Sequence, residues 1–493
     1  MKNKVFASFD EAVADIPDGA SIAMESWGPA GTAQNLIAAI KRKGLKDLTI
    51  ITHNLIPAIF SEEQAVLPSA LLPQMKKLIT AVVGIQQLGA GAFVKEYVEK
   101  GLEVEFTSHG TLPSRLLAGA TGLGAIYSPI GVGTILEEGK EKRVIDGKEY
   151  IYEKPILPDY AFIMAHKADK MGNLYYLGTH RMDQPVMAMA AKVTIAEVDE
   201  IVEVGEIDPE HVVTPGIFVD RIVNIPEGSL GSPKRRKELV YRLHEWEFAR
   251  KRLFRRIGSD LSRGLAKVET GEMKERLNRD TIAKRAAREL RDGDYANLGV
   301  GIPRLCALYM PEGVILHSEN GALGYGPPVM EDEVEKAELH YIDGAGRFFT
   351  PVSGMALCDV LTSVAMIRGG RLITILGAFE ISGKGDLANW NAGTDALGGT
   401  IGGGMDLVVG AKRVIITMEH TTKEGKPKIV KECSYPLTAK KCVDLIVTDL
   451  AVIEVTMEGL LLREVAPGWT AEEVQALTEP KLIVAAGLKE IEP

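Results

Sequence analysis

Short runs of apolar, mostly β-branched residues recur along the whole chain and alternate with helical segments and glycine-containing turns. Five of these runs are Leu48–Ile51, Val193–Ile195, Val314–Leu316, Leu372–Ile375 and Val414–Thr417. Runs that are apolar at consecutive positions are typical of strands covered on both faces, as in parallel sheets flanked by helices. The pattern therefore predicts an α/β protein with largely parallel sheets.

One arrangement of elements occurs twice: a helix, an Asp-Gly turn, a strand, a glycine-rich turn and a second helix. The first copy is predicted to start at Glu11 and to end near Ile40, with its turns at Asp18-Gly19 and Trp27–Gly31. The second copy consists of Thr281–Leu290, Asp292-Gly293, Tyr295–Leu298 and Gly299–Pro303 before a further helix. We therefore expect two similar domains, over 1–228 and 273–493, joined by a charged helical linker over 229–272.

The predicted linker contains a strongly basic segment. Lys234–Arg256 holds ten Lys or Arg against three Glu, with Trp246, Phe248, Leu253 and Phe254 interleaved. Such a segment could bind nucleic acid or the phosphates of a ligand. We favour a connecting helix whose apolar stripe docks on one domain, because the rest of the chain is acidic.

Composition narrows the classes of partner. The chain has 493 residues, 46% of them hydrophobic and 25% charged, which is typical of a globular protein of two or three domains. With 57 Lys or Arg against 67 Asp or Glu, the formal charge is −10, which disfavours a surface for nucleic acid or anionic membranes. The four cysteines form no CxxC motif, so we expect no metal site. Without a recognisable leader or membrane span, we expect a cytoplasmic protein.

The strongest candidate for chemistry is an acidic residue directly after a strand. Val314–Leu316 leads through His317 and Ser318 to Glu319, which stands at an Asn320-Gly321 turn. Ligands of open α/β sheets bind beyond the carboxyl ends of strands. A carboxylate nucleophile must be ionised and surrounded by hydrogen-bond donors, which a second glycine cluster, 398–404, could supply. The octapeptide alone leaves open an exposed turn carboxylate.

Several separated motifs in the second half resemble the β part of family I coenzyme A transferases, the succinyl-CoA:3-oxoacid type most of all. They are Ser318–Gly321, Tyr295–Pro303, Ala365–Gly370, Gly385–Trp390, Gly402–Leu407, Met418–His420 and Pro436–Thr438. In the first half, Val104–Ala120 is similar to the glycine-containing middle segment of the α part. The order α then β matches members with fused parts. The resemblance implies two similar open α/β domains, with largely parallel sheets, packed against each other.

The resemblance implies a mechanism that uses Glu319. The glutamate would attack an acyl-CoA such as succinyl-CoA, pass through an anhydride and a glutamyl-CoA thioester, and give coenzyme A to a 3-oxoacid or other short-chain acid. Coenzyme A is then a substrate, and no cofactor or metal is expected. By the same resemblance the Gly403 amide is an oxyanion donor, Asn297 lines the active site, and Asn320 and Gly321 belong to the binding motif. Relatives imply a homodimer or homotetramer.

Three positions depart from the family's pattern. Trp27 stands where a glycine is usual, so it could reshape the acyl pocket or serve in packing. His109 replaces a glutamine on the oxyanion side, where an imidazole can still donate one hydrogen bond but would respond to pH. Arg347 falls near a family lysine and would suit a carboxylate or a coenzyme A phosphate. We interpret His317 as a hydrogen-bonded structural histidine rather than a general base, and Glu25 as a structural or specificity residue.

Two other functions remain open. An acyl-CoA hydrolase would use the same glutamate and intercept the thioester with water. A ligand-sensing protein on the same scaffold would have no turnover, and only the basic segment supports it.

Overall fold

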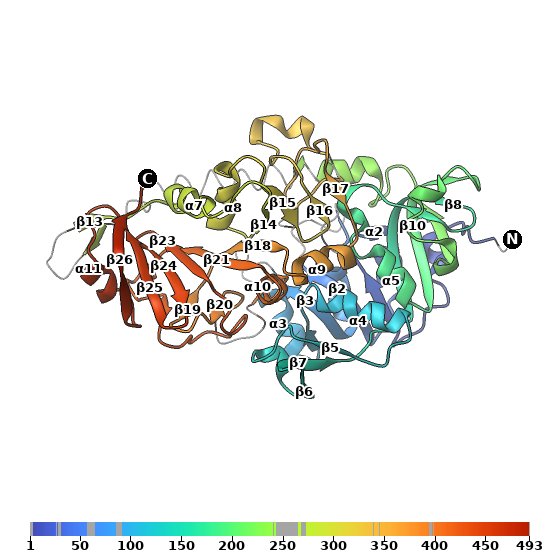
Figure 1. Ribbon diagram of the computed structural model, residues 1–493. Coiled ribbons are helices and arrows are strands. Elements are labelled where there is room, and N and C mark those ends of the chain that lie inside the picture. The colour runs from blue at the N-terminus through green and yellow to red at the C-terminus, as the bar shows by residue number, and fades with distance from the viewer. Residues whose placement is uncertain are drawn as a thin grey trace.

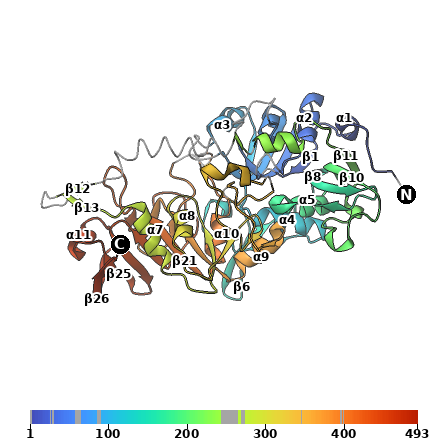
Figure 2. The same cartoon turned by 90° about the horizontal axis from the view of Figure 1, so that it is seen from above.

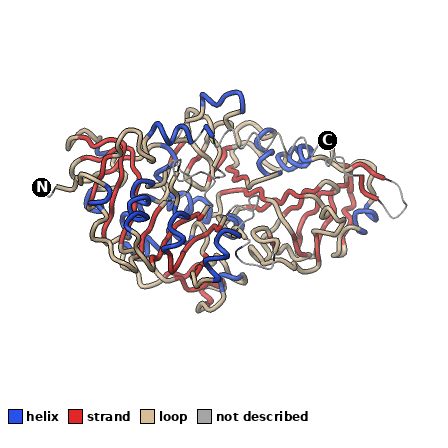
Figure 3. The backbone as a smooth tube through the Cα atoms, turned by 180° about the vertical axis from the view of Figure 1, so that it is seen from behind, coloured by secondary structure: helices blue, strands red, loops and turns tan. Residues whose placement is uncertain are grey.

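The structure of the protein is a computed structural model (Figure 1). It describes residues 3–25, 27, 31–56, 65–84, 91–239, 241–242, 265–267, 273–338, 340–344, 346–393, 397 and 399–492. The first half of the chain, blue to green, and the second half, yellow to red, lie beside one another in both views (Figures 1 and 2). Each half is built around its own large sheet, whose strands are red in the tube drawing (Figure 3).

The first domain contains an eight-stranded sheet in the order β11-β10-β8-β1-β2-β3-β4, whose neighbours along this path are all parallel. A short strand, β9, pairs antiparallel with β8. The strands are β1 (Ser21–Met24), β2 (Leu48–Leu55), β3 (Met75–Val83), β4 (Glu103–Phe106), β8 (Tyr160–Asp169), β9 (Leu174–Tyr175), β10 (Val193–Val202) and β11 (Arg221–Asn224). A smaller antiparallel sheet consists of β5 (Ile126–Ser128), β6 (Lys142–Ile145) and β7 (Lys148–Glu153).

The second domain contains a ten-stranded sheet in the order β17-β16-β15-β14-β18-β21-β23-β24-β25-β26. Its centre, from β15 to β23, is parallel, and antiparallel strands extend it on both sides. The strands are β14 (Tyr295–Leu298), β15 (Ile315–Ser318), β16 (Ala322–Leu323), β17 (Ala356–Leu357), β18 (Leu372–Leu376), β21 (Arg413–Met418), β23 (Leu445–Thr448), β24 (Ala451–Thr456), β25 (Gly459–Val465) and β26 (Leu482–Glu490). Two small sheets contain β12 (Leu265–Lys267) with β13 (Met273–Glu275), and β19 (Glu380–Ser382) with β20 (Leu387–Ala388) and β22 (Ile429–Val430).

Helices cover the sheets. In the first domain they are α1 (Phe9–Ala12), α2 (Gln34–Lys43), α3 (Ala92–Glu99), α4 (Thr111–Ala120) and α5 (Gln184–Ala190). In the second they are α7 (Arg279–Ala287), α8 (Ile302–Leu305), α9 (Val360–Arg368), α10 (Gly404–Val409) and α11 (Ala471–Ala476). Among the described residues, none of these helices combines the length and the hydropathy that a bilayer span requires.

The apolar runs behave as their pattern predicts. In β1, Ile22 and Met24 belong to one hydrophobic cluster and Ala23 to another, so this strand is covered on both faces. In β21, Ile415 likewise faces a different cluster from Val414 and Ile416. The prediction of two similar α/β domains with largely parallel sheets is confirmed.

The repeated unit is also found, with shifted ends. The first helix is α1, which begins at Phe9 and ends at Ala12 rather than covering 11–16. Helix α7 starts two residues before the predicted 281–290, because the Asn278 side chain caps it by accepting a hydrogen bond from Thr281 N–H at 2.9 Å. The strands that follow, β1 and β14, lie inside their sheets with parallel neighbours on both sides.

The predicted linker is described only in part. Residues 233–239 are helical, and the Arg236 side chain is buried and forms an ion pair with Asp199 of β10. This part of the basic segment is therefore docked on the first domain, as favoured from its apolar stripe. Residues 240 and 243–264 lie outside the described residues, so the boundaries at 228 and 272 stay a prediction.

The two domains are joined at the start of α4 by a buried ion pair. Asp406 of α10 accepts hydrogen bonds from Arg368 Nη2 at 2.6 Å and Nε at 2.9 Å, and from the Gly110 N–H at 3.0 Å. Arg368 also donates to Thr111 Oγ1 at 3.1 Å. A Cβ at Gly110 would overlap the Asp406 carboxylate, so only glycine allows this approach. The second domain therefore holds the turn that precedes α4.

Replacing Arg368 by Met should weaken the docking of the two domains. Asp406 is 1% exposed and Arg368 22%, so the change leaves a buried carboxylate without its cation. We expect a loss of about 3 kcal/mol in unfolding free energy, at the low end for breaking a buried pair. Urea unfolding followed by circular dichroism measures it.

The matched control is Arg463→Met, which breaks the exposed pair with Glu454 and should cost less than about 1 kcal/mol. Equal effects of the two substitutions would show that Arg368 does not hold the domains together.

Candidate active site

The bend after β15 is held by its own side chains and by the loop 342–344. The Ser318 hydroxyl donates to Asn320 Oδ1 at 2.8 Å and accepts a hydrogen bond from Gly344 N–H at 2.6 Å. Asn320 Nδ2 donates to the Ile342 carbonyl at 2.8 Å. Ser318 and Asn320 are both buried. The residues on either side of Glu319 are therefore fixed, and the Asn320 amide points at the loop.

A chain of hydrogen bonds fixes the backbone of Glu319. Asn297 Nδ2 lies 3.1 Å from His317 Nδ1, His317 Nε2 lies 3.0 Å from Ser363 Oγ, and the Ser363 hydroxyl donates to the Glu319 carbonyl at 2.6 Å. Burial lowers the pKa of His317 to about 4, so the ring is neutral at pH 7. It accepts from Asn297 and donates to Ser363. With both ring nitrogens engaged, the geometry favours a structural His317 over a general base.

The Glu319 carboxylate lies at the contact between the domains. It is 16% exposed, and its Oε1 contacts Nδ1 of His109, which precedes α4 of the first domain. A Cβ at Gly403 would overlap both carboxylate oxygens, so the backbone that opens α10 approaches the carboxylate closely. The His109 N–H donates to the Gly402 carbonyl at 3.0 Å, and His109 Nε2 lies 3.1 Å from Asn54 Oδ1. The ring that donates to Asn54 and also faces the carboxylate carries protons on both nitrogens.

Behind His109 lies a buried group of three ionisable side chains. His53 Nε2 is 3.0 Å from the His109 carbonyl, and His53 Nδ1 is 2.5 Å from Asp183 Oδ2. Glu25, the partner of Asp183, accepts from the Trp27 N–H at 2.6 Å. The Trp27 ring packs on the His109 ring with centroids 4.7 Å apart. Burial raises the pKa of Glu25 to about 8 and that of Asp183 to about 7.

The structure brings together only some of the residues that the sequence singled out. Glu319, His109 and Gly403 meet, and Asn297 acts on the bend through His317. Gly321 has φ +97°, and a Cβ there would overlap the Cys358 carbonyl, so it shapes the turn. Arg347 pairs with Asp343 at 3.4 Å on the loop beyond Gly344. Binding roles for Asn297, Asn320, Gly321 and Arg347 stay predictions. Gly28 and Gly398, parts of the glycine-rich turns, lie outside the described residues.

Sequence reasoning overlooked His53, Asp183 and Ser363. His53 follows the apolar run of β2 at the carboxyl end of that strand, which is the signal that pointed to Glu319 after β15. Asp183 directly precedes α5, and Ser363 lies on the buried side of α9, so both are ordinary positions in the sequence. Their importance comes from distant partners.

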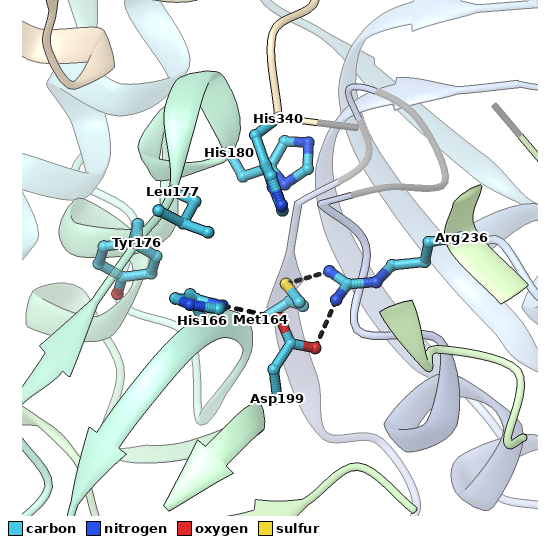
Figure 4. Close-up of a pocket in the computed structure, with 8 residues that line it drawn as sticks. All are labelled: Met164, His166, Tyr176, Leu177, His180, Asp199, Arg236 and His340. Carbon is cyan, nitrogen blue, oxygen red and sulfur yellow. Dashed lines mark hydrogen bonds and ion pairs between the residues drawn. The ribbon is translucent and has the colours of Figure 1, made fainter. Parts of the chain in front are cut away.

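A second polar cluster lies in a separate pocket (Figure 4). Asp199 pairs there with Arg236 and with His166 Nδ1 at 3.1 Å, and Arg236 Nη1 lies 3.3 Å from Met164 Sδ. The pocket is lined by Met164, His166, Tyr176, Leu177, His180, Asp199, Arg236 and His340. Burial lowers the pKa of His340 to about 4. Within the described part of the chain, no group of His, Cys, Asp and Glu is arranged to hold a metal ion.

Comparison with known proteins decides the family. The model of the coenzyme A transferase family matches residues 6–224 and 279–477. The chain belongs to the coenzyme A transferase family. The protein is therefore a CoA-transferase enzyme, and this membership does not favour the hypothesis of a ligand sensor without turnover.

Relatives match both the whole chain and parts of it. Succinyl-CoA:3-ketoacid coenzyme A transferase 2A, mitochondrial, of Mus musculus is 37% identical over 97% of this chain and 89% of its own length. One of the two kinds of subunit of the 3-oxoadipate CoA-transferase, from Acinetobacter baylyi, is 47% identical over 43% of this chain and 97% of its own length. The match to a separate polypeptide fits the interpretation of this CoA transferase as two fused parts.

A solved structure shares the fold. The acyl-CoA transferase from E. coli O157:H7, crystallised as a thioester complex with CoA, has a TM-score of 0.71 over 99% of this chain and 95% of its own, at 22% identity. At that identity the likeness concerns the arrangement of elements alone.

The expectation of a cytoplasmic protein is contradicted. The relatives that are 36–37% identical over nearly the whole chain are named as mitochondrial proteins. The expectation depended on the lack of a recognisable leader and on unpaired cysteines. Neither feature separates two reducing compartments, and residues near the amino terminus are no guide to the destination of the folded chain.

Replacing Glu25 by Gln should flatten the pH dependence of stability. Glu25 and Asp183 have raised pKa values, so above about pH 4.5 the folded protein binds protons that the unfolded chain has released. The free energy of unfolding of the wild type therefore falls as pH rises towards 8. Glutamine cannot ionise, and Asp183 loses its like-charged neighbour. Urea unfolding midpoints at pH 5, 6.5 and 8 should fall less in this variant.

Glu99→Gln, at an exposed glutamate of the same domain, is the control and should parallel the wild type. A variant Glu25→Gln that also parallels the wild type would show that the buried carboxyl ionises normally.

Proposed function

We propose that this CoA transferase moves coenzyme A from an acyl-CoA, with succinyl-CoA as the leading donor, to a 3-oxoacid or other short-chain acid through Glu319. The observation that carries the proposal is the position of the Glu319 carboxylate, between His109 and the backbone of Gly403. A partly exposed carboxylate beside hydrogen-bond donors remains ionised and can attack. The names of the relatives support 3-oxoacids as acceptors.

The first half of the reaction loads coenzyme A onto the enzyme. A Glu319 oxygen bonds to the thioester carbonyl carbon, the C–S bond breaks, and an acyl-glutamyl anhydride and CoA thiolate result. The thiolate then bonds to the glutamyl carbonyl carbon, and the donor acid leaves as a carboxylate. The enzyme now carries coenzyme A as a thioester on Glu319.

The second half reverses these steps with the acceptor. Its carboxylate attacks the glutamyl thioester and releases CoA thiolate, which attacks the acceptor acyl carbon of the new anhydride and frees Glu319. Because the first product leaves before the acceptor reacts, the kinetics are ping-pong. Each step exchanges oxygen and sulfur at an acyl carbon, so we propose that the reaction needs no cofactor or metal. The homodimer or homotetramer stays a prediction.

Each attack creates a negatively charged tetrahedral oxygen near the domain contact. The Gly403 amide and the His109 imidazole are the groups we assign to stabilise it, because both lie next to the carboxylate. The hydrogen-bond chain from Asn297 to the Glu319 carbonyl keeps the reacting carboxylate at a fixed distance from them.

Glu319→Gln should abolish the exchange of coenzyme A, by roughly 10⁴-fold or more for the loss of a nucleophile. Wild-type protein incubated with succinyl-CoA alone should carry coenzyme A on the peptide that contains Glu319, and hydroxylamine should release it. Mass spectrometry of the digested protein detects the adduct.

Glu312→Gln, an exposed glutamate before the same strand, is the control and should keep full exchange. Full activity of Glu319→Gln would end the proposal. Steady release of coenzyme A by the wild type without an acceptor acid would point to a hydrolase.

His109→Gln should keep most of the exchange activity but change its pH profile. Glutamine can donate a hydrogen bond to the same oxygen without titrating, whereas histidine changes charge around pH ~6.5 in its ordinary range. The measurement is kcat/KM for exchange between pH 5 and 9. We expect the plateau within about tenfold of the wild type, since one neutral donor replaces another.

The exposed His211→Gln serves as the matched control and should leave the profile unchanged. Superimposable profiles of wild type and His109→Gln would remove His109 from the oxyanion site.

A further inference from the structure

Three buried ionisable side chains take no part in the exchange steps. Glu25 follows β1, His53 lies in β2, and Asp183 precedes α5. Their exposed fractions are 2%, 0% and 0%. Burying two carboxyl groups costs free energy, because each prefers water when charged. They lie directly behind His109, so their arrangement calls for a role at the site.

The first route from this group leads through His53. The His109 carbonyl can only accept, so His53 Nε2, 3.0 Å away, carries a hydrogen and donates it. His53 Nδ1 then faces Asp183 Oδ2 at 2.5 Å. Burial lowers the pKa of His53 and raises that of Asp183, so the proton between them lies on the carboxyl and the ring is neutral. Asp183 therefore fixes the tautomer and the direction of His53.

The second route leads through Trp27. Its backbone N–H donates to Glu25 Oε1 at 2.6 Å, and its indole packs on the His109 ring at a centroid distance of 4.7 Å. The same indole meets the His53 ring edge-on at 5.9 Å. Glu25 thus holds the backbone of the residue that forms one wall beside His109, while Asp183 holds the carbonyl of His109 through His53.

Building on the proposed function, we propose that Glu25 and Asp183 form a proton-sharing positioning pair that holds His109 against the Glu319 carboxylate. The two carboxyls hydrogen-bond to each other, which requires one of them to be protonated. The ionisable groups that face the pair are His53, His109, Glu319, Asp359 and Asp406.

The charge of the pair affects the site. While it shares one proton the pair carries a single negative charge, and loss of that proton adds a second charge behind His109. Both raised pKa values fall near 7 to 8, so this change belongs to the neutral to mildly alkaline range. More negative charge behind the ring favours a doubly protonated imidazole. The pair therefore couples the protonation of His109 to pH.

Exchange kinetics of two substitutions at Asp183 test the positioning role. Asp183→Asn keeps a hydrogen bond to His53 and should retain kcat within about threefold at pH 6.5, whereas Asp183→Ala should lose roughly 10- to 100-fold in kcat with little change in KM. In a His109→Gln background the cost of Asp183→Ala should shrink to less than about threefold, because the two residues act in one chain. Equal costs in both backgrounds would overturn the proposal.

A fluorescence titration tests the coupling without turnover. A protonated imidazole in contact with an indole quenches its emission, so the emission of Trp27 reports the charge of His109. The signal is the difference between each protein and its Trp27→Phe counterpart, recorded from pH 5 to 9. Asp183→Asn and Glu25→Gln should both move the midpoint to lower pH, and His109→Gln should abolish the transition. An unmoved midpoint in both carboxyl variants would overturn the proposal.

The two readouts separate this inference from the function beneath it. Asp169→Asn changes a buried carboxylate of the same domain, which accepts from Met171 N–H and Asn173 N–H, and should leave both the profile and the midpoint unchanged. If Glu319 forms no adduct yet the midpoint moves, the proposed function fails and the positioning pair stands. If the adduct forms and neither readout responds, only the positioning pair fails.

Discussion

The contact between His109 and Glu319 is the interaction on which the site depends. It joins residues 210 positions apart, one from each domain. Neither side chain can reach the other unless the domains dock with the turn before α4 against the start of α10. That docking is provided by the Arg368–Asp406 pair and by backbone hydrogen bonds of Gly402 to His109 N–H and to the Ala81 carbonyl. The site is therefore a property of the interface.

Two departures from the family's pattern turn out to be one structural unit. Trp27 and His109 replace smaller or non-titrating residues in separate parts of the sequence, yet their rings pack against each other. The indole covers the face of an imidazole that would otherwise be more open to water. Exclusion of water strengthens the interaction of that imidazole with the carboxylate. The structure thus favours a role for Trp27 in holding His109 over a role in packing alone.

Glycine has a distinct purpose at the two places where the domains meet most closely. At Gly110 a side chain would displace Asp406, and at Gly403 it would displace Glu319. The glycines that the sequence suggested as sources of amide donors are thus needed also for steric reasons. Close backbone approach lets the second domain hold both the nucleophile and the turn that carries His109.

The sequence alone determined the α/β class, the two similar halves, the family and the importance of Glu319. These follow from local signals: apolar runs, Asp-Gly turns and short motifs whose residues are adjacent in the chain. It overestimated Asn320 as a group facing the carboxylate, because a motif does not reveal that its amide turns to the Ile342 carbonyl. Only the tertiary structure decided that Glu25, His53 and Asp183 gather behind His109. Each lies in an ordinary local context, and their proximity results from the parallel order of β1 and β2 and the placement of α5, which are long-range contacts that no local pattern encodes.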